Sequence, residues 1–408
     1  MENPYLNGPE ITNLVLKAQR IRESEKVFSD VVDAQGNYYV DLVQQGGGVL
    51  GIGLVGYTYI LEQAGIRIYS VAGTSAGAIN SLLIAGLAKI GDPVSVRILD
   101  VLSDKNLFDL LDGPRGIRKL IQKEVDGKTG LLWNVLWNAL PIYFSLKNRL
   151  GLNPGKDLQK WMVEALQKNQ ISSYGDLQRL RKETPLVKNR IAPDEPISPA
   201  QISFITSEIT THTRVELPKM AGLYWGDVQK ASPADFVHTS MAVPYLFEPF
   251  TKTAIPGAGK MAGERWSKFA GYRGKIPDKV RFVDGGLLSN FPINVFHVDR
   301  VPTRPTFGAR LSTFRQYYAP TDSLFNFSYA IFSTMRQIHD YEVILKNPDY
   351  RQLICNIDAD EEFSWLNFNM SQQRQKELFM LGARKGLEFL KKFDWSTYKE
   401  TRKWLLRS

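Results

Sequence analysis

The chain has 408 residues, of which 43% are hydrophobic and 23% are charged, a composition typical of a globular protein and not of a disordered or fibrous one. Its 51 Lys and Arg residues exceed its 42 Asp and Glu residues, and the resulting formal charge of +9 favours an anionic partner such as a lipid surface or a nucleotide. The chain has no dense basic run and no zinc-finger pattern, which argues against duplex nucleic acid as that partner. It has one cysteine, Cys355, and its first twenty residues have no secretory leader pattern, so we expect a cytoplasmic protein that is not secreted.

The first elements in chain order alternate between helix and strand. The patterns predict a helix over 8–30, a strand over 38–45, a helix over 49–65, a strand over 66–73 and a helix over 75–91. The glycines of the 49–65 helix suggest that it packs closely against a sheet. Strand–helix–strand order with short links predicts an α/β fold with a parallel sheet and right-handed crossovers.

The rest of the chain divides into a helical insert and a second set of strands and helices. Residues 91–190 are mainly helical in pattern and contain an uncharged segment, 130–146, with Trp133 and Trp137. We favour a buried cap helix there over a membrane-facing lid. The later predictions are strands over 201–217, 279–286, 305–312 and 351–358, a helix over 233–250 broken at Pro244, a surface insertion over 255–277, and helices over 323–345 and 371–393, the last opened by a cap at Ser371.

The segment GGGVLG, residues 46–51, follows a predicted strand and precedes a predicted helix. It satisfies G-x-G-x-x-G, the dinucleotide-binding fingerprint, so a cofactor-binding oxidoreductase is one interpretation. That fingerprint also requires an acidic residue at the end of the next strand, to hold the ribose. Here the strand ends SVAG instead, which makes this interpretation the weaker one.

A second glycine motif, GTSAG at residues 73–77, fits G-x-S-x-G. In a sharp strand-to-helix turn, Gly73 and Gly77 would leave room for the turn and Ser75 would project as a nucleophile. The tetrahedral oxyanion would then need donors, which the backbone N–H groups of Ala76 and of the ladder Gly46, Gly47 and Gly48 could supply. A plain tight turn remains the alternative for this motif taken alone.

The base that activates the serine is predicted from FVDGG, residues 282–286. A strand that ends at Asp284 before Gly285 and Gly286 would present a carboxylate at the edge of the sheet, where it could accept the serine proton directly. An ordinary Asp-Gly turn is the alternative. His297 and His339 follow Asp284 as a catalytic triad would require, but their surroundings in the sequence favour surface or packing roles.

Taken in order, GGGVLG, GTSAG and DGG resemble the motifs of the patatin-like phospholipases, and SMAVPYLFEPF and YGDLQRL resemble further segments of that family. The resemblance covers roughly residues 38–312. It implies a three-layer α/β/α sandwich with a mostly parallel sheet. It also implies a Ser75–Asp284 dyad that cleaves acyl esters of membrane phospholipids, with no metal or other cofactor. The family often has Arg or Lys where this chain has Leu50, which puts a cationic contribution to the oxyanion site in doubt. The expected organisation is an extension over 1–37, a catalytic domain over 38–312 and an extension over 313–408 packed on that domain.

The glycine and serine block together with the terminal helices also resembles the bacterial patatin-like effectors of anti-phage signalling, in which a cyclic nucleotide activates a phospholipase. This looser resemblance implies a cyclic nucleotide activator, a homo-oligomer and action at the inner face of the cell membrane. An unregulated housekeeping lipase is the alternative.

Overall fold

The computed structural model describes residues 3–114, 116, 118, 143–257, 260–313, 318, 321–322 and 324–407. The uncharged segment over 130–146 was predicted as a cap helix. Its residues 130–142, with Trp133 and Trp137, lie outside the described residues. Residues 143–149 are helical.

One large sheet organises the described part of the chain. Its continuous order is β12-β11-β2-β3-β6-β10-β9. Outside this order, β1 pairs with β2 and β5, and β7 pairs with β6. The strands are β1 Val31–Val32, β2 Tyr38–Gln44, β3 Ile66–Thr74, β5 Lys188–Asn189, β6 Ile202–Glu208, β7 Thr213–Leu217, β9 Phe250–Thr253, β10 Lys279–Asp284, β11 Thr306–Arg310 and β12 Ile354–Asn356, while β4 Gly151–Asn153 and β8 Tyr245–Phe247 form a separate pair.

The expected mostly parallel sheet is in fact mixed. The pairs β12–β11, β11–β2, β2–β3 and β3–β6 are parallel, as the strand–helix alternation predicts. However, β10 pairs antiparallel with both β6 and β9, and β7 pairs antiparallel with β6. The chain turns from β6 directly into β7 through a short loop, and it joins β9 to β10 through residues 254–278, which include α10, so neither connection is a parallel crossover.

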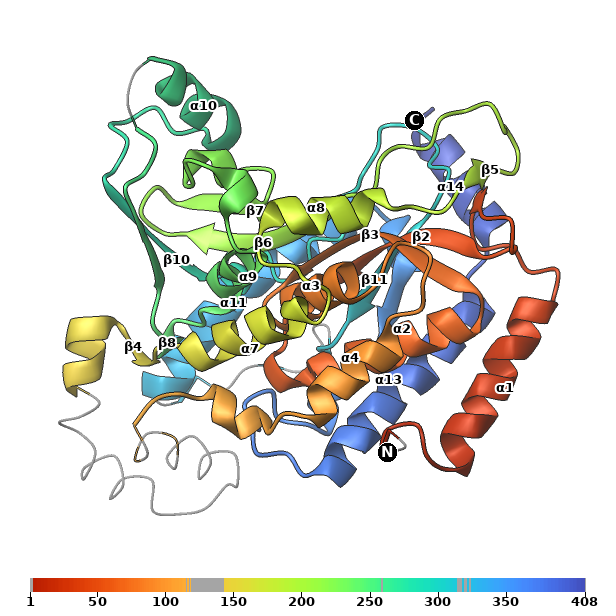
Figure 1. Ribbon diagram of the computed structural model, residues 1–408, viewed down its shortest axis with the longest axis horizontal. Helices are drawn as coiled ribbons and strands as arrows, with labels where there is room; N and C mark the ends of the chain where they lie inside the picture. Colours follow the sequence, from red (N-terminus) through yellow and green to blue (C-terminus); the bar gives the residue numbers. More distant parts are fainter. Residues whose placement is uncertain are drawn as a thin grey trace.

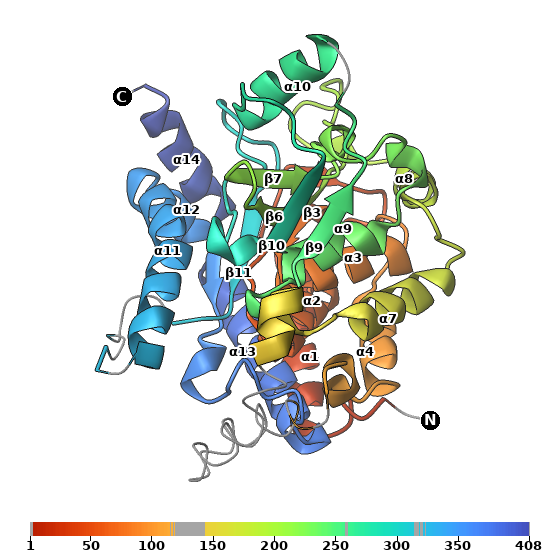
Figure 2. The ribbon, with the colours of Figure 1, turned by 90° about the vertical axis from the view of Figure 1, so that its left-hand side faces the viewer.

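The helices form layers on both faces of this sheet, as the three-layer prediction requires. Figure 2 shows α11, α12 and α14 on one side and α3, α7 and α9 on the other. The helices are α1 Pro9–Glu23, α2 Gly51–Gln63, α3 Ala76–Leu87, α4 Ser95–Ser103, α7 Lys156–Gln167, α8 Tyr174–Lys182, α9 Pro233–Met241, α10 Lys260–Ala270, α11 Leu324–Lys346, α12 Tyr350–Leu353, α13 Gln372–Lys392 and α14 Trp395–Leu405. Central strand β3 is buried along its whole length, which is typical of a strand covered on both faces.

The glycines of α2 serve a different purpose from the one predicted. Gly53 and Gly56 face helix α13, more than 300 residues later in the chain, and Gly51 faces Ala76 of α3. A Cβ atom on Gly56 would collide with the carbonyl of Phe379, and one on Gly382 would collide with the carbonyl of Gly53. The two helices therefore cross with their backbones almost touching, and Figure 1 shows α2 and α13 side by side.

One other prediction needs correction. The helix expected over 233–250 ends at Met241, before Pro244, and the chain continues into β8 and β9. The expected surface insertion over 255–277 does project from the body in Figure 1, and it includes helix α10. Helix α14 was not predicted. By contrast, Ser371 caps α13 as expected, accepting a hydrogen bond from the Arg374 N–H.

Candidate active site

The GTSAG motif forms the predicted sharp turn between β3 and α3. Ser75 has φ 52° and ψ −120°, a conformation that a non-glycine residue adopts at a cost of roughly 1–3 kcal/mol. Side chains on either glycine would block the turn, because a Cβ on Gly73 would meet the backbone of Gly77 and one on Gly77 would meet the carbonyl of Gln44. Gly73 and Gly77 therefore stand at the two positions of the turn where other backbone segments leave no room for a side chain.

Helix α9 anchors the backbone of this turn. The Ser75 N–H donates a hydrogen bond of 2.9 Å to the hydroxyl of Ser240, which in turn donates to the carbonyl of Ile205 at 2.5 Å. The first helical hydrogen bond of α3 runs from the Ile79 N–H to the Ser75 carbonyl, so the N–H of Ala76 has no acceptor within the helix. The side chain of Ser75 is only 6% exposed.

The glycine ladder lies directly against this serine. A Cβ atom on Gly46 would lie 2.9 Å from the Cβ of Ser75 and 2.5 Å from Oδ1 of Asn290. The Gly46 N–H donates to the Asn290 carbonyl at 3.1 Å, and the Asn290 side-chain amide donates to the Gly46 carbonyl at 3.2 Å. Gly46 thus brings the ladder close to Ser75, while its own N–H is already hydrogen-bonded.

The next residues of the ladder turn away into a short 3-10 helix over Gly48–Leu50. Gly48 has φ 56°, and a Cβ there would collide with the carbonyl of Trp365, which also accepts a hydrogen bond from the Val49 N–H at 3.2 Å. Within the described part of the chain, the N–H groups of Gly47 and Gly48 are therefore the ladder donors best placed to serve a ligand.

Asp284 lies at the end of β10, in register with the serine turn. Its register partner on β6 is Thr206, and Thr74 pairs with the preceding residue, Ile205, on the other side of β6. A Cβ on Gly285 would lie 2.9 Å from Cγ2 of Thr74, so the DGG turn packs against the residue before Ser75. The sheet brings the two predicted catalytic residues together with one strand between them.

Short hydrogen bonds hold the Asp284 carboxylate and backbone. Its Oδ1 accepts from the Gly286 N–H at 2.7 Å, and its N–H donates to the Ala242 carbonyl at 2.8 Å. The residue is 4% exposed. A carboxylate held by the N–H of the second glycine keeps its orientation without a histidine to position it.

The two histidines considered for a triad differ in position. Nδ1 of His297 lies 2.6 Å from the Tyr350 hydroxyl, and its Nε2 lies 3.4 Å from Asp299. His297 lines a separate pocket with Arg304 and Asp41, away from the serine turn. The side chain of His339 lies outside the part of the chain that the structure describes.

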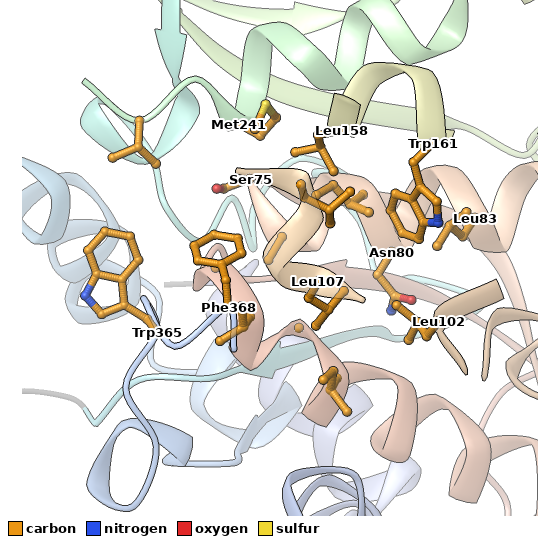
Figure 3. Close-up of a pocket in the computed structure, with 18 of the residues that line it drawn as sticks. Ser75, Asn80, Leu83, Leu102, Leu107, Leu158, Trp161, Met241, Trp365 and Phe368 are labelled. Carbon is orange, nitrogen blue, oxygen red and sulfur yellow. The ribbon is translucent and has the colours of Figure 1, made fainter. Parts of the chain in front are cut away.

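An apolar cavity opens beside Ser75, and we call it the apolar cavity throughout. Its empty volume, which includes the space open to solvent at its mouth, is about 790 Å³. In Figure 3, Phe368 lies below Ser75 and Trp365 lies to the lower left, while Leu83 and Trp161 lie to the right. Its lining residues are Gly48, Val49, Gly51, Ile52, Val55, Ser75, Ala76, Ile79, Asn80, Leu83, Ile98, Leu102, Leu107, Leu110, Leu158, Trp161, Met241, Val243, Leu246, Phe247, Trp365 and Phe368.

Several of these residues were not predicted from sequence. Trp365 and Phe368 come from the segment before α13, and Leu107 and Leu110 come from a short turn after α4. Ser240 begins the SMAVPYLFEPF segment and Asn290 follows the DGG motif, but no local pattern distinguished either residue from its neighbours. The position of Asn290 shortly after the DGG motif, in SNFP, is the signal that could have pointed to it.

Comparison with known proteins identifies one family. A sequence model described as patatin-like phospholipase matches residues 42–297, which is more than half of the chain. The chain is 29% identical over 364 residues to the uncharacterized protein YqhO of Bacillus subtilis (strain 168), covering 88% of this chain and all of that protein.

Solved structures with a similar arrangement are more distant. VipD from Legionella pneumophila matches with a TM-score of 0.43 and 17% identity, over 91% of this chain and 72% of VipD. ExoU, solved in complex with SpcU from the type III secretion system of Pseudomonas aeruginosa, matches with a TM-score of 0.35 and 17% identity, over 87% of this chain and 52% of the other. No helix among the described residues combines the length and the apolar character needed to cross a bilayer.

Proposed function

The chain belongs to the patatin-like phospholipase family, which implies lipid acyl ester hydrolysis, and from this premise we propose that it is a phospholipase A with a Ser75–Asp284 dyad. The observation that carries the proposal is the register of the sheet. Thr74, the residue before Ser75, pairs with Ile205 on one side of β6. Asp284 pairs with the next residue of β6, Thr206, on the other side. Family membership also replaces the dinucleotide-binding interpretation of the glycine ladder.

In the first half-reaction, Asp284 takes the proton of the Ser75 hydroxyl as the oxygen attacks the ester carbonyl. The tetrahedral oxyanion collapses, and the C–O bond to the lipid alcohol breaks. Asp284 returns the proton to that alcohol, which leaves as the lysophospholipid. In the second half-reaction Asp284 accepts a proton from water as the water oxygen attacks the acyl-serine carbonyl. The tetrahedral intermediate collapses, the C–O bond to Ser75 breaks, Asp284 returns the proton to the Ser75 oxygen, and the fatty acid is released.

The oxyanion is proposed to lie against backbone N–H groups of Gly47, Gly48 and Ala76. Ala76 begins α3, whose N-terminus carries partial positive charge that stabilises a developing anion. Leu50, at the position often held by Arg or Lys in the family, is buried and contributes no charge. The oxyanion would therefore be stabilised by dipoles fixed in the backbone, which need no reorganisation during the reaction.

The apolar cavity is the proposed site for the acyl chain. Apart from Ser75 and Asn80, its side chains are hydrocarbon, aromatic or thioether groups, so burying an acyl chain there is favourable by about 0.8 kcal/mol for each CH₂ group. We propose that the substrate is membrane phospholipid, reached from the inner face of the membrane.

The test is hydrolysis of mixed phospholipid vesicles by the purified protein, with release of fatty acid as the measurement. Ser75→Ala should lower the rate at least about a thousandfold and abolish labelling by a fluorophosphonate. Ser203→Ala is the matched control, because Ser203 is a buried serine of β6 whose hydroxyl has no partner among the described residues. Full activity in Ser75→Ala, or equal loss in both variants, would refute the assignment.

A further inference from the structure

A second cavity lies on the other side of the glycine ladder, and we call it the polar cavity. Its empty volume, which includes the space open to solvent, is about 800 Å³. It is lined by Gln45, Gly46, Gly47, Leu50, Asn290, Phe291, Arg310, Leu311, Ser312, Thr313, Ser333, Gln337, Asp340, Ile344, Asp360 and Trp365. Trp365 lines both cavities, and Gly46 lines this one while touching Ser75. Ser75 therefore lines the apolar cavity, and Gly46 is the residue between it and the polar cavity.

The polar cavity contains one cation, Arg310, among its described lining residues. Arg310 ends β11 and is only 7% exposed. Burial lowers the pKa of this guanidinium and nearby carboxylates raise it, and in either case an arginine in a protein stays protonated. Leu50, at the position where the family often has Arg or Lys, lines the same cavity. The positive charge that is missing at Leu50 is therefore supplied within this cavity by Arg310 of β11.

Two carboxylates share the cavity, and they differ in their hydrogen bonding. Asp340 accepts the Ser289 hydroxyl at 3.2 Å on Oδ1 and the Phe291 N–H at 2.7 Å on Oδ2, so both of its oxygens hold the loop after the DGG turn. Asp360 is exposed at the cavity rim, and the backbone and hydroxyl of Thr313 both donate to its Oδ1 at 2.7 Å. Asp360 is thus a fixed negative charge near the mouth of the cavity.

We infer that the polar cavity binds a zwitterionic phospholipid headgroup, with its phosphodiester against Arg310 and its ammonium group against Asp360. An amphiphile with its ester at Ser75 would place its chain in the apolar cavity and its headgroup in the polar one. A buried guanidinium recognises a phosphate through paired N–H donors. A carboxylate at the rim then favours a headgroup that carries a cation over one that carries only negative charge. This inference rests on the proposed function and specifies the substrate class of the same site.

The test compares three substrates with wild-type protein and variants: phosphatidylethanolamine, phosphatidylglycerol with the same acyl chains, and p-nitrophenyl butyrate, which has no headgroup. We expect Arg310→Gln to lower kcat/KM roughly 10- to 100-fold on both phospholipids and to change it less than about twofold on the small ester. Asp360→Asn should lower kcat/KM for phosphatidylethanolamine only, roughly 3- to 10-fold. Glu361→Gln, at the exposed neighbouring position, is the matched control and should have no effect.

Arg310 is buried, so its replacement could unfold the protein. Gln337→Trp provides a second route, because Gln337 is exposed on α11 at the cavity wall and a tryptophan there fills the headgroup space. This variant should lose activity on both phospholipids and keep it on p-nitrophenyl butyrate. Folded Arg310→Gln, Asp360→Asn and Gln337→Trp proteins that all retain the wild-type ratio between the three substrates would overturn the inference.

A binding measurement separates this inference from the proposed function. Titration calorimetry with dihexanoyl-phosphatidylethanolamine on Ser75→Ala protein should show binding that Arg310→Gln weakens at least about tenfold. If the wild-type protein hydrolyses no ester but this difference in binding is found, the catalytic proposal fails and the headgroup site stands. If esters are hydrolysed but binding is the same with and without Arg310, the headgroup site fails and the catalytic proposal stands.

Discussion

The backbone N–H of Ser75 donates to the hydroxyl of Ser240 at 2.9 Å, which links the strained turn after β3 to helix α9. Both residues are buried. A buried N–H that loses its acceptor costs about 1–3 kcal/mol, so this one hydroxyl stabilises a backbone conformation that Ser75 would not adopt readily by itself.

Replacing that hydroxyl should therefore affect both stability and catalysis. We expect Ser240→Ala to lower the free energy of unfolding by about 1–3 kcal/mol and kcat by about tenfold or more, with little change in KM. Urea denaturation and steady-state kinetics on p-nitrophenyl butyrate provide the two measurements. A variant that lost stability but kept the wild-type kcat would show that Ser240 supports the fold and does not position the nucleophile.

The contact between Gly46 and Ser75 leads to a second prediction. A methyl group on Gly46 would lie 2.9 Å from the Ser75 Cβ and 2.5 Å from Oδ1 of Asn290, so Gly46→Ala must shift the nucleophile or the ladder. We expect a loss of kcat of roughly a hundredfold, because small displacements of reacting groups are costly. Gly222→Ala is the control, since a Cβ there would meet no atom within 4 Å. Similar activity in the two variants would contradict the proposed role of the ladder.

The dyad and the triad make different predictions for histidine variants. Asp284→Asn should be nearly inactive because an amide cannot accept the serine proton, whereas Asp278→Asn, an exposed aspartate just before β10, should be fully active. His297→Ala should retain most activity, since His297 contacts Tyr350 and Asp299 and lies away from the serine turn. Loss of several orders of magnitude in folded His297→Ala protein would instead support a triad.

A buried histidine should make stability depend on pH. Burial lowers the pKa of His238 from 6.5 to about 4, and the charge of Asp112 opposes this shift only partly. Between pH 6.5 and 4 the unfolded chain binds a proton that the folded chain does not, so stability is lost as the pH falls through this window. The difference corresponds to about 3 kcal/mol.

The measurement is urea denaturation of wild-type and His238→Gln proteins between pH 4 and pH 7. The wild-type protein should lose about 3 kcal/mol more than the variant as the pH falls. His212→Asn is the control, because His212 is exposed and has φ 58°, a conformation that asparagine adopts readily. Parallel pH curves for wild-type and His238→Gln proteins would rule out this source of acid sensitivity.

The looser family resemblance predicts control by a nucleotide. We expect weak activity on vesicles for the protein alone, and an increase in both turnover and oligomer size with a cyclic di- or trinucleotide. A ligand that changes the ratio of active to inactive protein from 1:99 to 99:1 must bind the active state more tightly by about 5.5 kcal/mol. Turnover and light scattering across a nucleotide panel test this expectation. High activity that no nucleotide changes would favour an unregulated lipase.

The local backbone of the catalytic motifs could be predicted from sequence. GTSAG encodes its turn because only glycine fits at Gly73 and Gly77, where the backbone of the turn meets its neighbours. Strands β2, β3 and β10 begin and end within two residues of their predicted positions, because buried strands and turn residues leave strong local patterns. These short-range features were sufficient to identify Ser75 and Asp284 as candidates.

The tertiary structure alone decided which distant segments complete the site. Helix α13 packs on the glycines of α2, the segment before α13 brings Trp365 to both cavities, and β11 ends at Arg310 in the polar cavity. No local pattern marks these residues, because their role depends on contacts with residues roughly 250 to more than 300 positions away in the chain. The sequence also did not determine the direction of β10 relative to its neighbours. Side chains alternate in the same way in parallel and antiparallel strands, so the direction depends on the connection and on the neighbouring strand.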